Sequence, residues 1–124
     1  MSTRCIVRIK GKIGNSEKQV DLYHHHDGYI EGVGFDLINR FYDFGSQSFN
    51  FREITRVVNT LIKDNSDEYE FTLYKHTDIE YFYTVDTDNN TLKVQSVSYI
   101  KGKLCTYWTY NQDKILKLYN KKEV

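Results

Sequence analysis

The sequence predicts an α+β domain: an antiparallel β-sheet of about five to six strands with two helices packed on one face, in the order ββ-αα-ββββ. Apolar and polar residues alternate near the start of the chain and again from Tyr69 onward, as they do in half-buried strands. Between these regions, apolar residues recur at helical spacing. The 124 residues include no proline and only seven glycines, so no flexible linker is expected. We therefore expect residues 1–124 to form a single domain.

The first two strands are expected to form a hairpin. In Cys5–Ile13, apolar side chains alternate with mainly basic ones. Gly14-Asn15-Ser16 predicts a turn, because these residue types favour tight chain reversals. The segment Gln19–His25 then predicts a second strand that returns along the first.

Two amphipathic helices are predicted in the middle of the chain. Helical spacing places the first at about Glu31–Asp43, with Gly45 as its stop. The second begins with a capping box, in which Asn50 caps the helix and Glu53 returns a bond to its backbone. The polar residues 64–67 are expected to end this helix.

From Tyr69 onward the pattern has a period of two, which indicates strands. A skip in the alternation after Val94 suggests a β-bulge. Lys101-Gly102 predicts a tight hairpin turn, and Ile115–Asn120 predicts either a last short strand or a helical turn. The expected strands are Tyr69–Lys75, Glu80–Val85, Thr91–Ile100 and Leu104–Tyr110.

The charges balance overall but not locally. Seventeen basic and seventeen acidic residues give a net charge of zero, which argues against a general nucleic-acid-binding domain. Residues 64–90, in contrast, carry a net charge of −7. They could form an acidic interface, although strand pleating would scatter the carboxylates over two faces. The candidates for that interface are Asp67, Glu68, Glu70, Asp78, Glu80, Asp86 and Asp88.

The cysteine spacing and the charged N-terminus both favour a protein of the cytoplasm. Cys5 and Cys105 lie far apart and outside any Cys-x-x-Cys spacing, so we expect free thiols rather than a disulfide or a zinc site. Arg4 and Arg8 stand where a signal peptide would need apolar residues. No segment approaches the roughly 18 apolar residues of a membrane span. The expected location is the cytoplasm, with no membrane partner.

The most unusual stretch holds three of the four histidines. A metal site would take His24 and His26, which would share a strand face, with Asp27 or Glu31. An acid–base site would pair His25 with Asp27. Neither interpretation has a spaced ligand or a nucleophile to support it. The favoured interpretation is structural, with Asp27 capping the next helix and the glycines allowing close packing. We therefore expect no metal, no cofactor and no catalytic residue.

Two further motifs favour ordinary structure. Asp86-x-Asp88-x-Asn90 copies the start of a calcium loop but lacks its later glycine and glutamate, so it predicts a hairpin turn. Tyr99, Tyr107, Trp108 and Tyr110 lie beside lysines and would suit base stacking. Strand alternation, however, places Trp108 and Tyr110 on one face and Tyr107 on the other.

The first forty residues resemble a family of small proteins encoded in phages, prophages and other mobile elements of bacteria. The resemblance rests on Ser2-Thr3-Arg4 and on Tyr23-x-His25-x-Asp27-Gly28-Tyr29-x-Glu31-Gly32-Val33-Gly34, where the family reads Y-x-H-x-D-G-Y-P-E-G-x-G. This chain has Ile30 where a proline is usual. The family has no established activity, so the resemblance implies only a mobile-element protein in a bacterial cell. The signature suggests a binding loop at His25, Asp27, Gly28, Tyr29, Glu31, Gly32 and Gly34.

The leading functional hypothesis is a non-enzymatic protein that binds a host protein or ribonucleoprotein complex. Its specific form is an inhibitor of a bacterial defence system such as CRISPR-Cas, an anti-CRISPR protein. The acidic segment could imitate a phosphate backbone, and the eleven tyrosines suit an interface. The alternative is a nucleotide- or metal-dependent enzyme or ligand-binding module centred on the loop from His24 to Glu31. Direct nucleic-acid binding is a third, less favoured option, and the oligomeric state is left open.

Overall fold

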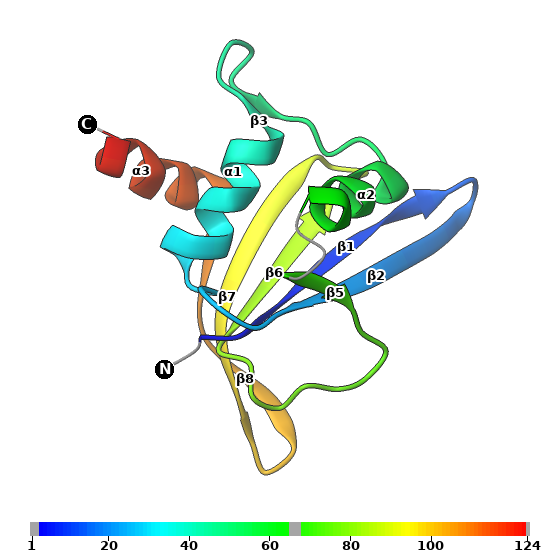
Figure 1. Cartoon of the computed structure of the whole chain (residues 1–124), viewed down its shortest axis with the longest axis vertical. Helices are drawn as coiled ribbons and strands as arrows, with labels where there is room; N and C mark the ends of the chain where they lie inside the picture. The colour runs from blue at the N-terminus through cyan, green and yellow to red at the C-terminus, as the bar shows by residue number, and fades with distance from the viewer. Residues whose placement is uncertain (1–2, 65–67, 124) are drawn as a thin grey trace.

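The computed structural model describes residues 3–64 and 68–123, and it confirms the α+β class. Helices cover one face of a six-stranded sheet (Figure 1). The strands of this sheet are β1 (Cys5–Ile13), β2 (Ser16–His24), β5 (Tyr69–Phe71), β6 (Tyr81–Asp86), β7 (Thr91–Ile100) and β8 (Lys103–Asn111). A small separate sheet consists of β3 (Tyr42–Asp43) and β4 (Ser48–Phe49). The helices are η1 (Ile30–Gly34), a π-helical turn, followed by α1 (Phe35–Phe41), α2 (Ile54–Asp64) and α3 (Gln112–Glu123).

The sheet is mixed, so the prediction of a purely antiparallel sheet is wrong at one pair of strands. The order is β5-β2-β1-β6-β7-β8, and β1 pairs with β6 in parallel. The other neighbours are antiparallel. The cause is the segment 72–80, which crosses the helix-free face instead of turning back as a hairpin. On that face, the Tyr23 hydroxyl donates to Asp78 (2.9 Å) and the Glu80 amide donates to the Arg4 carbonyl (2.9 Å).

The main core lies between the sheet and the helices. Val7 and Ile9 of β1 are fully buried there with Leu37 of α1 and with Val57 and Leu61 of α2. Helix α2 packs on β1, β2 and β5, whereas α3 packs on β7 and β8. Each fully buried side chain of this size contributes about 1.5–3 kcal/mol, so this face supplies most of the apolar stabilisation.

A second, smaller apolar cluster lies on the helix-free face. Ile6, Tyr23, Ile79 and Val97 form it, with Phe82 and Tyr99 packed against them. It explains the skip after Val94, since Val94 faces the helices and Val97 faces this second cluster. The predicted irregularity is also present, but the extra residue belongs to β8: Ser96 pairs with Trp108 and Val97 with Thr106, leaving Tyr107 between them.

The first predicted helix is shorter than expected. Instead of Glu31–Asp43, the helical segment begins with η1 at Ile30 and ends with α1 at Phe41. Tyr42 is already extended (ψ 126°) and starts β3. The predicted stop, Gly45, therefore lies in the turn between β3 and β4, where its amide donates to Asp43 (2.9 Å).

The predicted capping box of the second helix does not form. Helix α2 begins at Ile54, four residues after Asn50. The Asn50 amide instead donates to the Phe41 carbonyl (2.7 Å), and the Phe51 amide donates to the Asn90 side chain (2.8 Å). These bonds hold the chain extended in front of α2. The helix ends near Asp64 as expected, while Asp67 lies outside the described residues.

A third helix occupies the position of the predicted last strand or helical turn. Helix α3 begins directly after Asn111, whose side-chain oxygen accepts the Lys114 amide (3.1 Å) as an N-cap does. Ile115 is fully buried, and the Tyr119 ring packs edge-on against Phe35 (5.1 Å). The prediction of two helices was wrong. The cap at Asn111 and the apolar residues of α3 directly follow β8, so no turn in the sequence marks the change from strand to helix.

Candidate functional site

The signature forms a tight corner, which we call the signature corner (residues 25–34). Strand β2 ends at His24, and Asp27 then turns the chain with a φ of 54°. This turn brings Gly28 against the start of the chain, where its amide donates to the Thr3 carbonyl (2.9 Å). From the other side, the buried Tyr83 hydroxyl donates to the Gly28 carbonyl (2.7 Å). The corner is therefore fixed to β1 and β6.

Two glycines of the signature are required by close contacts. A Cβ on Gly32 would lie 1.9 Å from the Asp27 carbonyl oxygen, and a Cβ on Gly28 would lie 2.9 Å from the Cys5 Cβ. The same Asp27 carbonyl accepts the Val33 amide (2.9 Å), which begins the helical segment. The predicted side-chain cap by Asp27 is not formed, because its carbonyl takes that role and its carboxylate accepts the Tyr29 hydroxyl (3.1 Å).

His24 is a buried member of the sheet. Its side chain is 8% exposed, its ring meets Tyr69 edge-on (4.6 Å), and its Nε2 lies 4.0 Å from a Glu68 oxygen. Its Nδ1 makes no hydrogen bond of normal geometry. Burial lowers the pKa of His24, opposed by the His26 backbone and the Glu68 carboxylate. The imidazole is therefore neutral at pH 7.

The other two histidines leave the strand, so the predicted sharing of one strand face by His24 and His26 is wrong. His25 hydrogen-bonds a Glu70 oxygen (2.9 Å) and meets the Tyr23 ring edge-on (4.6 Å). The carboxylate bonded to His25 is therefore Glu70, and not the Asp27 that the acid–base interpretation predicted. His26 is exposed, with its ring 6.2 Å from that of His25.

A hollow of about 380 Å³ opens beside the histidines, lined also by Asp27, Gly32, Val33, Asp36, Glu68 and Tyr69. One of its carboxylates, Asp36, already accepts bonds from Tyr69 (2.7 Å) and Arg40 (3.0 Å). Within residues 3–64 and 68–123, no group of three or more His, Cys, Asp or Glu side chains is arranged to hold a metal ion. Tyr29 and Glu31 of the signature are exposed. The hydrogen bond to Asp27 raises the pKa of Tyr29.

The acidic residues of the predicted interface do not gather in one place. Glu68 and Glu70 lie beside the histidines, and Asp78 lies at the same end of the sheet, where it pairs with Arg4 (3.3 Å) and accepts the Tyr23 hydroxyl (2.9 Å). Glu80 is exposed just before β6, and Asp86 ends that strand about 20 Å away. Asp86 and Asp88 hold their own turn and the end of β1, through bonds to the Asn89 and Lys12 amides respectively. The described acidic residues therefore divide between two ends of the sheet.

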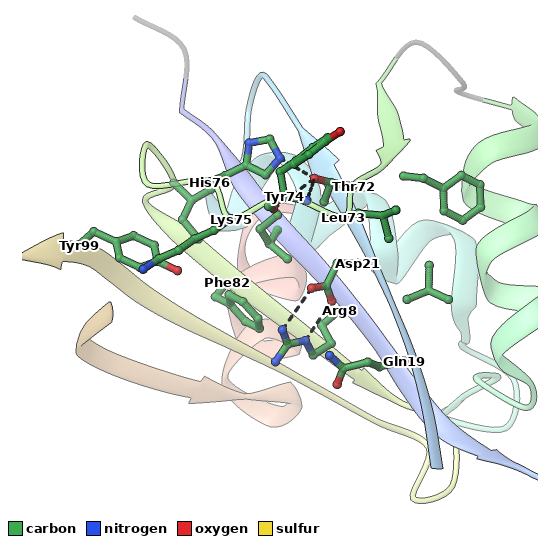
Figure 2. A pocket seen from close by; sticks show the side chains of 14 residues that line it. Arg8, Gln19, Asp21, Thr72, Leu73, Tyr74, Lys75, His76, Phe82 and Tyr99 are labelled. Atoms are coloured by element: carbon green, nitrogen blue, oxygen red, sulfur yellow. Dashed lines mark hydrogen bonds and ion pairs between the residues drawn. The ribbon is translucent and has the colours of Figure 1, made fainter. Parts of the chain in front are cut away.

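The structure reveals a groove on the helix-free face that the sequence analysis missed. The segment 72–80 is here called the groove loop; its residues 72–75 were predicted to continue a strand from Tyr69, but β5 ends at Phe71. A hollow of about 510 Å³ lies between this loop and the sheet (Figure 2). At its rim Leu73 is 98% exposed, Tyr74 83% and Phe71 63%. Alternation in the sequence predicts a strand here, and no signal in it marks these side chains as exposed.

The groove loop is held by its own polar groups. Thr72 hydrogen-bonds His76 Nε2 (2.6 Å) and accepts the Tyr74 amide (3.2 Å), and its amide donates to the Asp21 carbonyl (3.2 Å). The His76 ring stacks on Tyr23 (3.9 Å, 13°). These contacts fix the backbone on both sides of Leu73, so its exposure does not arise from a loose segment.

The charged side chains that line the groove already make contacts within the protein. Arg8 donates two hydrogen bonds to Asp21 (2.9 and 3.1 Å) and lies over the Phe82 ring (4.9 Å) (Figure 2). The hydrogen bonds to Asp21 raise the pKa of Arg8 above its ordinary value. Lys75 donates to the Gly102 carbonyl (3.1 Å) and lies over the Tyr99 ring (4.8 Å). The groove therefore presents an apolar rim above a floor in which Asp21 neutralises the charge of Arg8.

Fold and geometry together define a small α+β protein with a pre-formed apolar groove on the open face of its sheet. Comparisons with protein-family models, with curated proteins and with solved structures found no match to the chain. None of the helices in the described residues has the length and apolar character needed to cross a membrane.

Proposed function

We propose that this chain is a non-enzymatic binding protein that docks on a host macromolecule through its groove loop. The observation that carries the proposal is the exposure of Leu73 and Tyr74 on a backbone fixed by Thr72 and His76. Apolar side chains held in water gain free energy when a partner covers them, and clustered exposed ones mark interaction sites. Because the backbone is already ordered, little conformational entropy is lost on binding.

The chemistry of the groove favours a protein surface over nucleic acid. Leucine and tyrosine anchors suit apolar pockets on proteins, and tyrosine is common among the residues that dominate binding energy. Phosphate binding needs free cations, but Arg8 is paired with Asp21, and Lys75 is engaged by the Gly102 carbonyl and the Tyr99 ring. The proposed partner is therefore a protein subunit with an apolar pocket, either alone or within a ribonucleoprotein complex.

The choice of target rests on the resemblance of the first forty residues to mobile-element proteins. Such proteins meet host defence complexes, and a small binding protein can block one by covering a functional surface. We propose inhibition of a CRISPR-Cas effector complex as the specific function. The groove loop takes over the role first given to the acidic segment, since the described carboxylates of that segment divide between two ends of the sheet.

The test is a plasmid-cleavage assay with a panel of purified single-protein and multisubunit CRISPR effector complexes. We expect one effector to be inhibited, and the L73A/Y74A variant to bind it at least about 30-fold more weakly, the effect of losing about 2 kcal/mol of anchor contacts. The variant should keep its fold, because both side chains are largely exposed.

Ile13→Ala is the matched control, since Ile13 is an exposed apolar residue at the distant end of the β1–β2 hairpin. This variant should inhibit as the unchanged protein does. Failure to inhibit any effector in the panel would refute the inhibitor proposal. Inhibition that survives in L73A/Y74A would show that another surface binds the target.

A further inference from the structure

The outer edge of β8 is the longest strand edge at either end of the six-stranded sheet. β8 spans nine residues, whereas β5 at the opposite end of the sheet spans three. Within the described residues, no strand pairs with this side of β8. Unpaired amides and carbonyls along an edge favour pairing with another strand, and charged side chains usually oppose it. Only one residue of β8 is charged, Lys103.

The turn before β8 determines which backbone groups are free. Lys101 and Gly102 have positive φ values (53° and 79°), the pattern of a two-residue type I′ hairpin. Residues that flank such a turn exchange both of their hydrogen bonds, and in an antiparallel ladder such pairs alternate with non-bonded ones.

Between the turn and the bulge of β8, this alternation leaves the backbone groups of two residues pointing outward. Lys103 pairs with Ile100 as the bonded pair next to the turn, and Cys105 occupies the next bonded position. Leu104 lies between these two positions and Thr106 follows them, so both occupy non-bonded positions. Their amides and carbonyls therefore point away from β7. They are free to bond a strand added outside β8.

The strand is complementary to itself in this region. In an antiparallel arrangement centred on Cys105, Leu104 lies opposite Thr106 of a second copy, and the same pair recurs on the other side of the centre. Lys103 then lies opposite Tyr107, so no two like charges face each other. The bulge at Tyr107 confines regular pairing to residues 104–106, which include both residues with outward-pointing backbone groups.

Apolar side chains accompany the free edge. Ile100, Leu104 and Tyr107 are all exposed at the end of the β7–β8 hairpin. Figure 1 shows this hairpin extending past the helices, so α1, α2 and α3 do not cover it. A second copy would cover the free backbone groups and some of these side chains together.

We propose that two copies of this chain associate through their β8 edges, antiparallel and centred on Cys105, to form one continuous twelve-stranded sheet. The arrangement is a closed twofold dimer, because the same edge is used on both sides. It is a short interface, so the dimer dissociates readily on dilution. This association uses the outer edge of β8 and neither of the groove-loop anchors, Leu73 and Tyr74.

Cysteine trapping tests the register. At a cross-strand position without mutual hydrogen bonds, Cα atoms lie about 4.5 Å apart, close enough for a disulfide. Diamide, which takes up two electrons and two protons from a pair of thiols, should convert the protein to a disulfide-linked dimer that a reductant reverses. Cys105→Ser should abolish the disulfide-linked dimer. Cys5 does not interfere, because it is fully buried and burial raises its thiol pKa.

Charged substitutions at the β8 edge test the strand pairing without disulfide formation. The variant L104K/T106K places lysines opposite lysines, and L104E/T106E places carboxylates opposite carboxylates. In sedimentation equilibrium each should associate at least tenfold more weakly than the unchanged protein. An equimolar mixture should restore a dimer, which a folding defect would not do.

T55K/N59K, on the exposed side of α2, adds the same charge away from the edge and should leave the dimer unchanged. A protein that stays monomeric at millimolar concentration and gives no Cys105 disulfide would overturn the proposal. Dimers that persist in L104K/T106K would also overturn it. The two proposals fail separately, since L73A/Y74A should still dimerise and L104K/T106K should still block the effector.

Discussion

Replacing Gly32 with alanine tests whether the signature builds a packed corner. The added Cβ would lie 1.9 Å from the Asp27 carbonyl oxygen, so the two segments must separate by about 1.5 Å to reach the 3.4 Å at which ordinary contact begins. That movement stretches the bond from the Val33 amide to the same oxygen (2.9 Å). Overpacking costs about 1–3 kcal/mol, and a lost backbone hydrogen bond costs about 1 kcal/mol. We expect G32A to lose about 2–4 kcal/mol of unfolding free energy.

Urea and thermal unfolding, followed by circular dichroism, measure this loss. For a chain of this size, about 1 kcal/mol corresponds to about 4 °C, so the melting temperature should fall by about 8–16 °C. Gly45→Ala is the control, because its Cβ would meet only the Asp43 carboxylate at an exposed turn (3.2 Å). That variant should stay within about 0.5 kcal/mol of the unchanged protein. Equal stability of G32A and G45A would refute the packed corner and reopen a ligand-binding role for the glycines.

Three further predictions concern stability. Burial lowers the pKa of His24 below its unfolded value of 6.5, so between these two pKa values the folded state binds fewer protons than the unfolded state. The free energy of unfolding should therefore fall as the pH drops from 7 toward 5. His24→Gln should flatten that part of a urea–pH profile. A steeper profile in the variant would contradict this. Asn111→Ala should cost about 1 kcal/mol through loss of the α3 cap, with Asn111→Asp retaining stability, and equal loss in both would exclude the cap. Leu61→Ala should cost about 2–5 kcal/mol and Leu73→Ala less than about 0.5 in the same assay, since Leu61 is fully buried and Leu73 is exposed; similar losses would contradict this placement.

Local patterns predicted much of the fold. The strand Cys5–Ile13 and the strand Thr91–Ile100 were predicted to the residue, because each has a period of two over most of its length and borders a predicted turn. The Lys101-Gly102 turn is confirmed by its positive φ values, and the Asp86–Asn90 turn by the bonds from the Asp88 and Asn89 amides to Asp86. These features depend on neighbours in the sequence, which is the information that periodicity and turn chemistry contain.

The misjudged features depend on contacts between distant segments. The parallel pairing of β1 with β6 follows from the path of the groove loop across the open face, which no local pattern encodes. The start of α2 is set by Asn90, which bonds the Phe51 amide from 39 positions away. Tertiary contacts such as these override local capping signals.

The candidate site divides in the same way. The glycines of the signature were expected to allow close packing, and Gly28 and Gly32 do so. The partner of His25, Glu70, is 45 positions away and was not predicted. The groove was missed entirely, because alternation treats Leu73 as a strand residue whereas β5 ends at Phe71 and the chain leaves β2 after the Thr72 amide bonds Asp21. Sequence patterns identify which residues are unusual, but the fold decides which of them reach the surface.

NMR relaxation of the free protein tests the central claim most directly, because a pre-formed binding surface requires an ordered groove loop. If Thr72, Tyr74 and His76 hold that loop as the structure shows, the amides of Leu73 and Tyr74 should have order parameters near 0.85, like the strands beside them. Order parameters below about 0.6 at these two amides would contradict a pre-formed surface.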